Sequence, residues 1–309
     1  MSFLRTGLLA LTTFFPLAVN ADVEVGDLPE GTVWYLHADL EAMRTSEAGS
    51  KVYDWFDDEV VVEVKEEVGI DIGEEVDSLT AFADTDDGTV IIVEGPMTKD
   101  TRDKLLALAA AEGPVDPREH NGDTYYFFGD EDDIDDRGDE PFEDLEDAVF
   151  VSFALSGKAL VTGTEEQMRA LLDNDGNISG SGSHDGALLV LSANKSLVQA
   201  GMQTDGMIDA DDDDDWESNI VRNTEQAALL MADKDGQIAI EAQLVSTDPK
   251  MAEAIGGIVN GLIALQAFNS ELGPDIQSLI RNTRIDVVEN VLSINMVINP
   301  DLIVSVLDD

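Results

Sequence analysis

The chain contains no cysteine, few basic residues and few aromatic residues. Without cysteine it can form no disulfide, no thiolate metal site, no thiol nucleophile and no lipid-modified cysteine. Lysine and arginine account for 17 of the 309 residues, against 66 aspartate and glutamate residues, so the formal net charge is −49. Nucleic acid is excluded as a partner class, because phosphate binding needs clustered basic side chains. An anionic membrane surface is disfavoured for the same reason.

Residues 1–21 have the pattern of a secretory signal peptide. Arg5 supplies a positive start, Gly7 to Val19 form an apolar stretch, and Val19 and Ala21 are small residues that suit cleavage after Ala21. The apolar stretch is shorter than the ~20 residues that span a bilayer, and no later segment has a spanning pattern. The sequence therefore predicts a periplasmic or secreted protein with no integral membrane segment after signal removal. A buried N-terminal helix is the alternative.

Acidic residues occur in nearly every segment of the chain and not only in tracts. In low salt such charges repel one another across the folded surface. At ~1 M salt the Debye length falls to about 3 Å, and the repulsion is screened. The spread of the acids favours adaptation to a saline medium, and we expect a halophilic exported protein. A cation buffer is the competing interpretation.

Two tracts, residues 130–147 and 209–217, are so acidic that neither has an apolar face to bury. Both are expected to be solvated loops. Their carboxylates are also weak candidates for Ca²⁺ or Mg²⁺ capture, since these cations prefer oxygen ligands. The candidate metal ligands are Asp132, Asp133, Asp135, Asp136, Asp211, Asp212, Asp213 and Asp214. Beyond such loosely bound cations, the sequence predicts no cofactor.

Three short Asp- and Gly-containing segments resemble calcium loops only in part. Asp84–Gly88 and Asp173–Asn177 place glycine at the fifth and fourth loop positions, whereas an EF-hand requires it at the sixth. Asp233–Gly236 is too short a match. All three are predicted to be turns.

Two segments far apart in the chain share one pattern. Leu79–Leu105 and Ala227–Glu253 each contain an apolar run, an Ala-Asp pair, an Asp-Gly turn, a second apolar run and a helix start. An Asp-Gly turn between apolar runs predicts a β-hairpin. Upstream, Gly31–Met43 and Gly186–Val198 each predict a strand followed by a helix N-cap. The predicted N-caps are Asp39, Asn194, Thr98, Asp248, Thr164 and Asn299.

The downstream segments Val149–Leu172 and Arg284–Leu307 each predict a hairpin followed by a helix. The sequence therefore predicts an α+β fold of two similar repeats. Each repeat reads strand, helix, hairpin, helix, hairpin, helix, with mostly antiparallel sheets packed by helices. The repeats are expected at 22–176 and 186–309, joined by a Gly/Ser linker at 177–185. Sheet pairing across the linker would make them one composite unit.

The repeats are expected to differ in their insertions. In the first, Ser50–Val68 predicts a long helix with Tyr53, Phe56, Val60, Val64 and Val68 on one face, and Thr124–Phe128 predicts an extra strand. That strand's alternating aromatic side chains are expected to pack in the core, the alternative being that one face binds an apolar or sugar ligand. In the second, the segment from Pro249 to about Phe268 predicts a very apolar helix with Gly256, Gly257 and Gly261. We expect it to lie buried against a sheet, the alternative being a dimer or lipid-contact surface.

No catalytic motif is present. The histidines are His37, His120 and His184, and no pair of them has metal-ligand spacing. His37 is expected to be structural, although its place after a strand would also suit the mouth of a pocket. A nucleophile elbow and a nucleotide-binding glycine fingerprint are both absent from the sequence. With 66 acids, carboxylate pairs are uninformative, so no catalytic residue is assigned and the pattern leans against an enzyme.

Several short motifs resemble a known family. Leu28–Val33 with Leu36–Leu40, Gly69–Gly73 and the Leu79–Gly95 hairpin are similar to segments of secreted proteins from marine and halophilic gammaproteobacteria. The resemblance covers roughly residues 28–128. It implies an exported, periplasmic α+β protein. The family has no assigned activity, so the resemblance transfers no site residue.

Three functions remain open from the sequence. The first is a non-enzymatic periplasmic binding or interaction protein, which a single apolar groove in an acidic surface would favour. The second is a hydrolase using carboxylates alone, which would need buried, convergent carboxylates in a cleft. The third is a divalent-cation-binding envelope protein using the acidic tracts.

Overall fold

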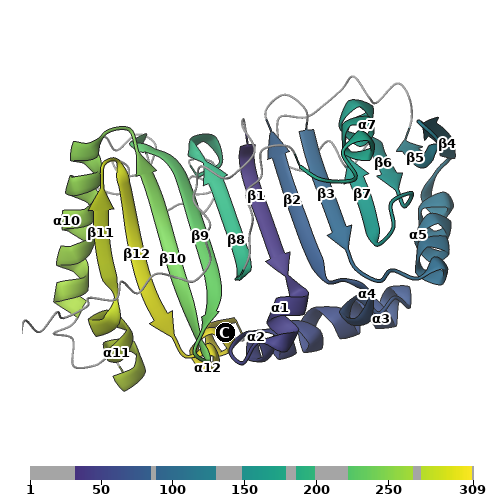
Figure 1. Cartoon of the computed structure of the whole chain (residues 1–309). Helices are drawn as coiled ribbons and strands as arrows, with labels where there is room; N and C mark the ends of the chain where they lie inside the picture. The colour runs from purple at the N-terminus through teal and green to yellow at the C-terminus, as the bar shows by residue number, and fades with distance from the viewer. Residues whose placement is uncertain are drawn as a thin grey trace, which may run out of the picture.

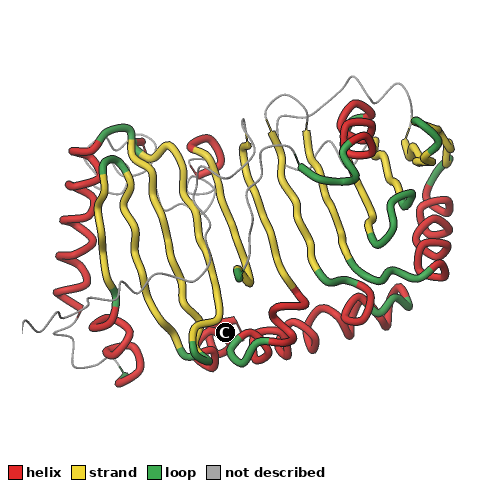
Figure 2. Tube along the Cα trace, viewed as in Figure 1, coloured by secondary structure: helices red, strands yellow, loops and turns green. Residues whose placement is uncertain are grey.

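The computed structural model describes residues 32–84, 88–129, 148–178, 186–198, 222–266 and 273–307. Twelve strands form one antiparallel sheet in the order β11-β12-β10-β9-β8-β1-β2-β3-β7-β6-β5-β4 (Figure 1). Most of the described helices lie at the two ends of the sheet and along one row of strand ends, as the red segments of Figure 2 show. Helix α7 packs against β6 and β7, and a short helical turn at 195–198 follows β8 at the opposite row of strand ends. No described helix is drawn across the middle of the sheet in this view. The central strands are therefore the part of the sheet with the least helical cover.

The strands are β1 (Thr32–Asp39), β2 (Ser78–Asp84), β3 (Gly88–Glu94), β4 (Val115–His120), β5 (Asp123–Gly129), β6 (Ala148–Ser152), β7 (Lys158–Thr162), β8 (Ala187–Asn194), β9 (Thr224–Lys234), β10 (Gln237–Ser246), β11 (Arg284–Val288) and β12 (Val291–Ile298). The helices are α1 (Leu40–Thr45), α2 (Gly49–Phe56), α3 (Val62–Val68), α4 (Ile72–Glu75), α5 (Lys99–Glu112), α7 (Glu165–Asp173), α10 (Pro249–Gln266), α11 (Pro274–Asn282) and α12 (Pro300–Leu307).

The predicted α+β class and the antiparallel pairing are confirmed. Sheet pairing across the predicted linker, which the sequence left open, does occur, because strands from both sides of the linker belong to one sheet. They join where β1 pairs with β8, through Trp34–Ala38 against Leu189–Ala193. Both strands are apolar on their two faces, so neither can stand at a solvent-exposed sheet edge without loss of burial. Of the linker itself, the structure describes only residues 177–178. The signal-peptide segment and both acidic tracts lie outside the described residues.

The predicted helix N-caps hold. The Asp39 carboxylate accepts the Ala42 N–H at 2.7 Å, and the Asn194 side chain accepts the Leu197 N–H at 3.2 Å. The caps Thr98, Thr164, Asp248 and Asn299 likewise accept backbone N–H groups in the first turns of their helices. A capping side chain satisfies donors that the helix leaves open, which explains why these helices begin at these residues.

The turn predicted at Asp233–Gly236 joins β9 to β10, with φ of 54° at Asp235 and 76° at Gly236. Two left-handed residues give the tight turn that suits twisted strands. Asp233 Oδ2 also accepts the Ala48 N–H at 2.7 Å, which ties the α1–α2 connection to this hairpin. Asp173–Asn177 is the end of α7 and its following turn. Residues 85–87 of the corresponding first hairpin turn lie outside the described residues.

The long helix predicted at Ser50–Val68 forms, but with a π-helical turn at Asp57–Val61 between α2 and α3. Tyr53 and Val61 are buried, whereas Val60 is only half-buried. A π turn accommodates one extra residue, so it moves the inward-facing position from Val60 to Val61. The regular spacing in the sequence cannot reveal this one-residue shift.

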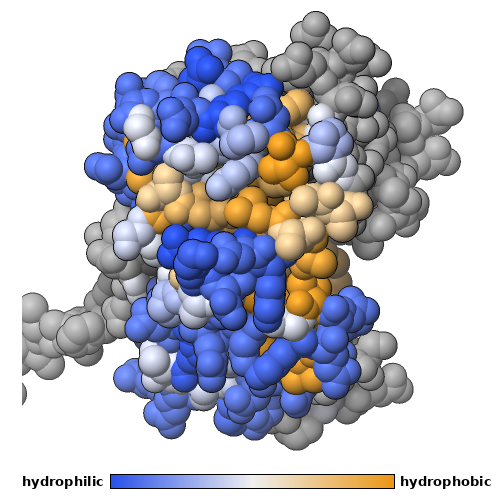
Figure 3. Space-filling view, turned by 90° about the vertical axis from the view of Figure 1, so that its right-hand side faces the viewer, coloured by the Kyte–Doolittle hydropathy of each residue, from blue (hydrophilic) through white to orange (hydrophobic). Residues whose placement is uncertain are grey.

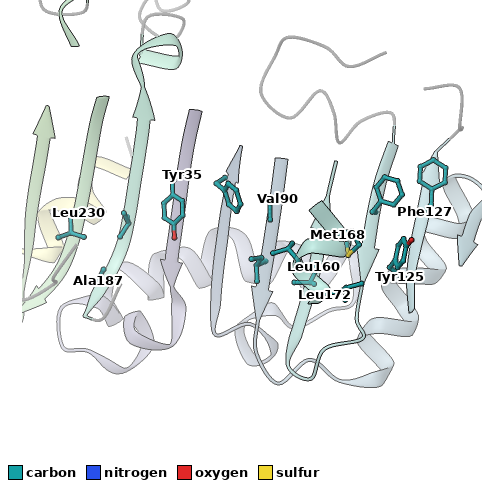
Figure 4. Packing of buried hydrophobic residues seen from close by; sticks show 14 of the residues in the cluster. Tyr35, Val90, Tyr125, Phe127, Leu160, Met168, Leu172, Ala187 and Leu230 are labelled. Atoms are coloured by element: carbon teal, nitrogen blue, oxygen red, sulfur yellow. The ribbon is translucent and has the colours of Figure 1, made fainter. Parts of the chain in front are cut away.

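The largest core cluster follows one face of the sheet from β10 to β5 (Figure 4). Its aromatic members include Tyr35, Phe82, Tyr125, Phe127 and Phe150, all almost fully buried. In β5, Tyr125 and Phe127 are 1% and 3% exposed, whereas the intervening Tyr126 is half-buried. The predicted alternation in this strand and its use in core packing are confirmed.

The apolar helix predicted from Pro249 to about Phe268 is α10, described from Pro249 to Gln266. The expectation that it is buried is only half right. Ala252, Ile255 and Gly256 are buried, but Ile258, Leu262 and Leu265 are 38%, 44% and 71% exposed. The helix lies at the β11 end of the sheet, where it meets the sheet with one side only (Figure 1). Strand β4 and helix α11 were not expected from the sequence.

Within the described ranges, no helix is long and apolar enough to cross a membrane.

Candidate functional site

The central strands carry an apolar groove on the face opposite the main core cluster. In β1, Trp34 and Leu36 belong to this face, while Tyr35 packs in the main core. Successive side chains of a strand point to opposite faces, so a strand with two apolar faces must serve two apolar surfaces. One of them is the core. The other is the groove.

The strand register brings matching groove residues side by side. Leu36 lies opposite Ala81 of β2 on one side and opposite Leu191 of β8 on the other. Ala193 lies between Trp34 and Ala227. The alanines have short side chains, so this stretch of sheet forms a floor between larger leucine and tryptophan side chains.

The groove has a volume of about 850 Å³. From the first half of the chain it is lined by Trp34, Leu36, Leu79, Ala81 and Ile91. From the second half it is lined by Leu191, Ala193, Leu197, Ala227 and Leu229. Tyr35, Ser192 and Ala228 complete the lining. Among the described lining residues there is no carboxylate and no basic side chain.

One end of the groove is fixed by the start of a helical turn. Leu197, which lines the groove, donates its N–H to the Asn194 cap. Just outside the lining, Lys195 Nζ lies 3.2 Å from Glu225 Oε1. Glu225 is the extra residue of a β-bulge, where the pairing of β9 with β10 shifts by one residue, and neither member of the pair lines the groove.

A second hollow, of about 380 Å³, lies between α5 and the start of β5. Its lining mixes charged residues such as Arg102 and Asp123 with Leu106, Tyr126 and Phe153. Figure 3 views this end of the molecule and shows a hydrophobic band between hydrophilic areas. The Arg102 guanidinium donates to the Met97 carbonyl at 3.2 Å, and Lys99 pairs with Asp103. The hollow is smaller and chemically less uniform than the groove.

A polar cluster fastens β4 and β5 to α7. Tyr125 donates its hydroxyl to Glu165 Oε1 at 2.5 Å, and Arg169 pairs with the same oxygen at 2.8 Å. Arg118 lies 3.3 Å from Glu165 Oε2 and stacks over the Phe127 ring. Burial would raise the pKa of Glu165, but the hydrogen bonds from Tyr125 and Arg169 and the two guanidinium charges lower it below its ordinary value. The cluster holds an ionised carboxylate in a fixed structural position.

His37 and His120 make hydrogen-bonding contacts within the fold. His37 Nδ1 lies 2.8 Å from the Thr80 hydroxyl, its cross-strand partner, on the face away from the groove. Burial lowers the pKa of His37, with Asp39 and Glu94 acting in the opposite direction. His120 Nε2 lies 2.9 Å from Asp173 Oδ1, next to Asn121. His184 lies outside the described residues.

The eight aspartates named as candidate metal ligands all lie outside the described residues, so the structure does not place them. In the ranges that it does describe, no group of three or more His, Asp or Glu side chains could hold a metal ion.

Sequence reasoning missed the groove. Apart from Leu197, which follows the predicted Asn194 cap, its residues fall in predicted strands, and none of them was named as a candidate site residue. A usable signal is present in β1, β8 and β9, where both alternating sets of side chains are apolar, as in strands covered on two faces. Without the strand order, that pattern cannot tell a second buried face from an open groove.

No family model and no curated protein sequence matches this chain. Among solved structures, crystal form III of TP0453 is 12% identical and matches with a TM-score of 0.49, over 91% of this chain and 96% of that chain. Crystal form IV of TP0453 is also 12% identical and gives a TM-score of 0.46, over 94% of this chain and 98% of that chain. Similarity at this level carries no argument about function.

Proposed function

We propose that this chain is a non-enzymatic binding protein that holds an apolar small molecule in the groove over β9, β8, β1, β2 and β3. The observation that carries the proposal is the lining, which consists of apolar side chains around a volume of about 850 Å³. Pockets for small molecules usually enclose about 300–1,000 Å³ and are mostly apolar. Each Å² of apolar surface that a ligand removes from water contributes about 25 cal/mol, before the entropic cost of binding.

The groove favours this function over a carboxylate hydrolase. Such an enzyme needs carboxylates that converge on the substrate, and the described lining contains none. A divalent-cation function would rest on the two acidic tracts, which lie outside the described residues. It remains a separate proposal that calcium titration tests. We also propose export to the periplasm or medium, on the signal-peptide pattern of residues 1–21.

We propose further that the two halves arose by duplication and that the groove straddles their local two-fold axis. Aligning Gly31–Met43 with Gly186–Val198 makes Leu36 equivalent to Leu191, and these two leucines are also cross-strand partners. An axis between them relates β1 to β8. Outward from this pair, each half places the hairpin β2–β3 or β9–β10 next, followed by β7–β6 or β12–β11. This order supports the proposal because chance would not align both register and strand order.

A neutral fluorescent probe tests the binding function. N-phenyl-1-naphthylamine brightens when it enters an apolar site, so titration of the full-length mature protein should give saturable fluorescence. Ala193→Phe and Ala227→Phe, alone and together, place aromatic rings on the groove floor and should weaken binding by about tenfold or more.

The matched control is Ala110→Phe, at an exposed position on α5 away from the groove. It should bind the probe as the unmodified protein does. Circular dichroism establishes that each variant is folded. Probe binding that is absent, or that survives in the folded groove variants, would contradict the proposal.

A further inference from the structure

The groove is much longer across the strands than along them. Its lining comes from five neighbouring strands, in the order β3, β2, β1, β8 and β9. Among the described lining residues, each of these strands turns at most two side chains to the groove face, as β8 does with Leu191 and Ala193. Neighbouring strands lie about 4.8 Å apart, and two residues on one face of a strand lie about 6.7 Å apart. The groove is therefore about 19 Å long and about 7 Å wide.

Helix α10 limits the length of the groove at its β9 end. Ala227 of β9 is opposite Leu244 of β10, which is opposite Leu292 of β12. Such cross-strand partners lie on one face of a sheet. A Cβ on Gly256 of α10 would lie 3.4 Å from Leu292 Cδ1, so α10 packs on the same face as the groove. The open stretch of this face therefore ends between β9 and α10.

A small core cluster limits the width of the groove along one long side. Met231, two residues beyond Leu229 in β9, packs with Met43 of α1 and Ile303 of α12 against this cluster. Because side chains alternate along a strand, Met231 lies on the groove face. The first position past the lining of β9 is thus already covered by helices, and the groove cannot widen in that direction.

The floor of the groove is uneven along its length. In the central strand β1, both groove positions carry large side chains, Trp34 and Leu36. The lining includes Ala81 of β2 on one side of β1, and Ala193 and Ala227 on the other side. The large side chains of β1 thus stand between two lower stretches. A rigid, flat ring system leaves gaps over such a floor and loses dispersion contacts there, whereas a hydrocarbon chain follows it by rotation about its C–C bonds.

We propose that the ligand is a linear, flexible hydrocarbon chain that lies across the strands from β3 to β9. An extended chain advances about 1.3 Å per carbon, because its C–C bonds are about 1.5 Å long, so about 15 carbons span the groove. This inference rests on the proposed binding function. It adds the class of the ligand, its direction over the sheet and its length.

A series of 1-monoacylglycerols, with acyl chains of 6 to 18 carbons, varies the chain length under one uncharged head group. Each compound competes with N-phenyl-1-naphthylamine for the full-length mature protein, below the concentration at which the compound aggregates. Each added methylene should tighten binding about two- to fourfold, up to the effect of one fully buried CH₂. The gain should stop at about 14–16 carbons, where the chain fills the groove.

Two substitutions shorten the groove from its β3 end. Ile91→Trp fills the groove at β3 and should move this limit to about 11 carbons, and Ala81→Phe fills it at β2 and should move the limit to about 8 carbons. Ala110→Phe, at the exposed position on α5, should leave the limit unchanged. Circular dichroism verifies the fold of the three variants. The limit in the unmodified protein tests the inference without any variant.

Cholesterol supplies the rigid comparison, because its fused rings are apolar and uncharged but cannot follow the uneven floor. It should compete with the probe at least about tenfold more weakly than the 16-carbon monoacylglycerol.

Four results would overturn the inference: no competition by any chain, a gain that stops at 12 carbons or fewer or continues through 18 carbons, a limit that stays the same in folded Ile91→Trp and Ala81→Phe, or cholesterol binding as tightly as the 16-carbon chain. In each of these cases the neutral probe still binds, so the proposed function stands. Failure of that probe to bind the unmodified protein would overturn the function itself, and the two failures are thereby distinguished.

Discussion

At the residue scale, the sharpest electrostatic feature is Glu165. Its carboxylate receives Tyr125 and Arg169 on one oxygen and faces Arg118 with the other. Because these partners stabilise the charged form more than burial disfavours it, the pKa of Glu165 is lower in the folded chain than its ordinary value. A carboxyl group of this kind stabilises the fold above its unfolded-state pKa, and the stabilisation is lost as the pH falls through the folded-state pKa.

We therefore predict that Glu165→Gln lowers the free energy of unfolding at pH 7 by about 1.5–3 kcal/mol, the range for a hydrogen bond to a charged group. The deficit should shrink as the pH falls below the ordinary Glu value of 4.5. Chemical denaturation at a series of pH values measures it. Glu166→Gln, at the exposed neighbouring position, is the control. A deficit that stays constant from pH 7 to pH 3 would show that Glu165 does not act through its charge.

At the element scale, two adjacent glycines of α10 differ in their surroundings. A Cβ on Gly256 would lie 2.8 Å from Val287 Cγ2, whereas a Cβ on Gly257 would have nothing within 4 Å. Gly256 allows the helix to approach β11 and β12 closely. Gly257 has no such packing role and only weakens the helix, since glycine is a poor helix former.

We predict that Gly257→Ala raises the free energy of unfolding by about 0.5–1 kcal/mol, the difference in helix propensity. Gly256→Ala should lower it by about 1–3 kcal/mol, the usual cost of overpacking. Urea denaturation in constant salt compares the two variants. Equal effects from both would mean that α10 does not pack on the sheet as described.

Elements of this protein are predictable where local chemistry decides them. Asp39, Asn194, Thr164 and the Asp235-Gly236 turn act within a few residues of chain, and each was predicted from the sequence. The π-helical shift to Val61 was not, because tertiary packing selects the inward residue. Strand β4 escaped notice because Pro117 and its charged neighbours lack a strand pattern. As an edge strand, β4 tolerates a proline that a central strand would not.

The candidate site was harder to predict than the fold, because its residues come from strands that are far apart in the sequence. Its floor brings Leu36, Ala81, Ala193 and Ala227 together from four strands. Only the strand order, set by contacts far apart in the sequence, makes these residues neighbours. A search for catalytic or metal motifs does not detect such a site, because a ligand would be recognised by the shape of the groove and by its apolar side chains.

At the scale of the whole molecule, the net charge of −49 dominates. The folded chain holds these charges closer together than the unfolded chain does, so their repulsion favours unfolding. Native stability is typically about 5–15 kcal/mol, so such a term can decide whether the chain folds.

We predict that the midpoint of thermal unfolding rises between 50 mM and 2 M NaCl, because salt screens the repulsion. Each 1 kcal/mol regained should raise the midpoint by about 2–4 °C for a chain of this size. Circular dichroism melts across the salt series measure it. A flat or falling midpoint would contradict salt adaptation. A sharp rise with millimolar Ca²⁺ and none with NaCl would instead favour specific cation binding.

We propose that an apolar molecule occupies the groove over the central strands, and photo-crosslinking locates that molecule directly. An alkyl diazirine probe, irradiated with the full-length mature protein and mapped by peptide mass spectrometry, should label the segments 34–36, 191–197 and 227–229. Excess N-phenyl-1-naphthylamine should suppress the labelling. Label concentrated on the exposed side of α10 or at the α5 end, with the groove strands unmodified, would contradict the claim.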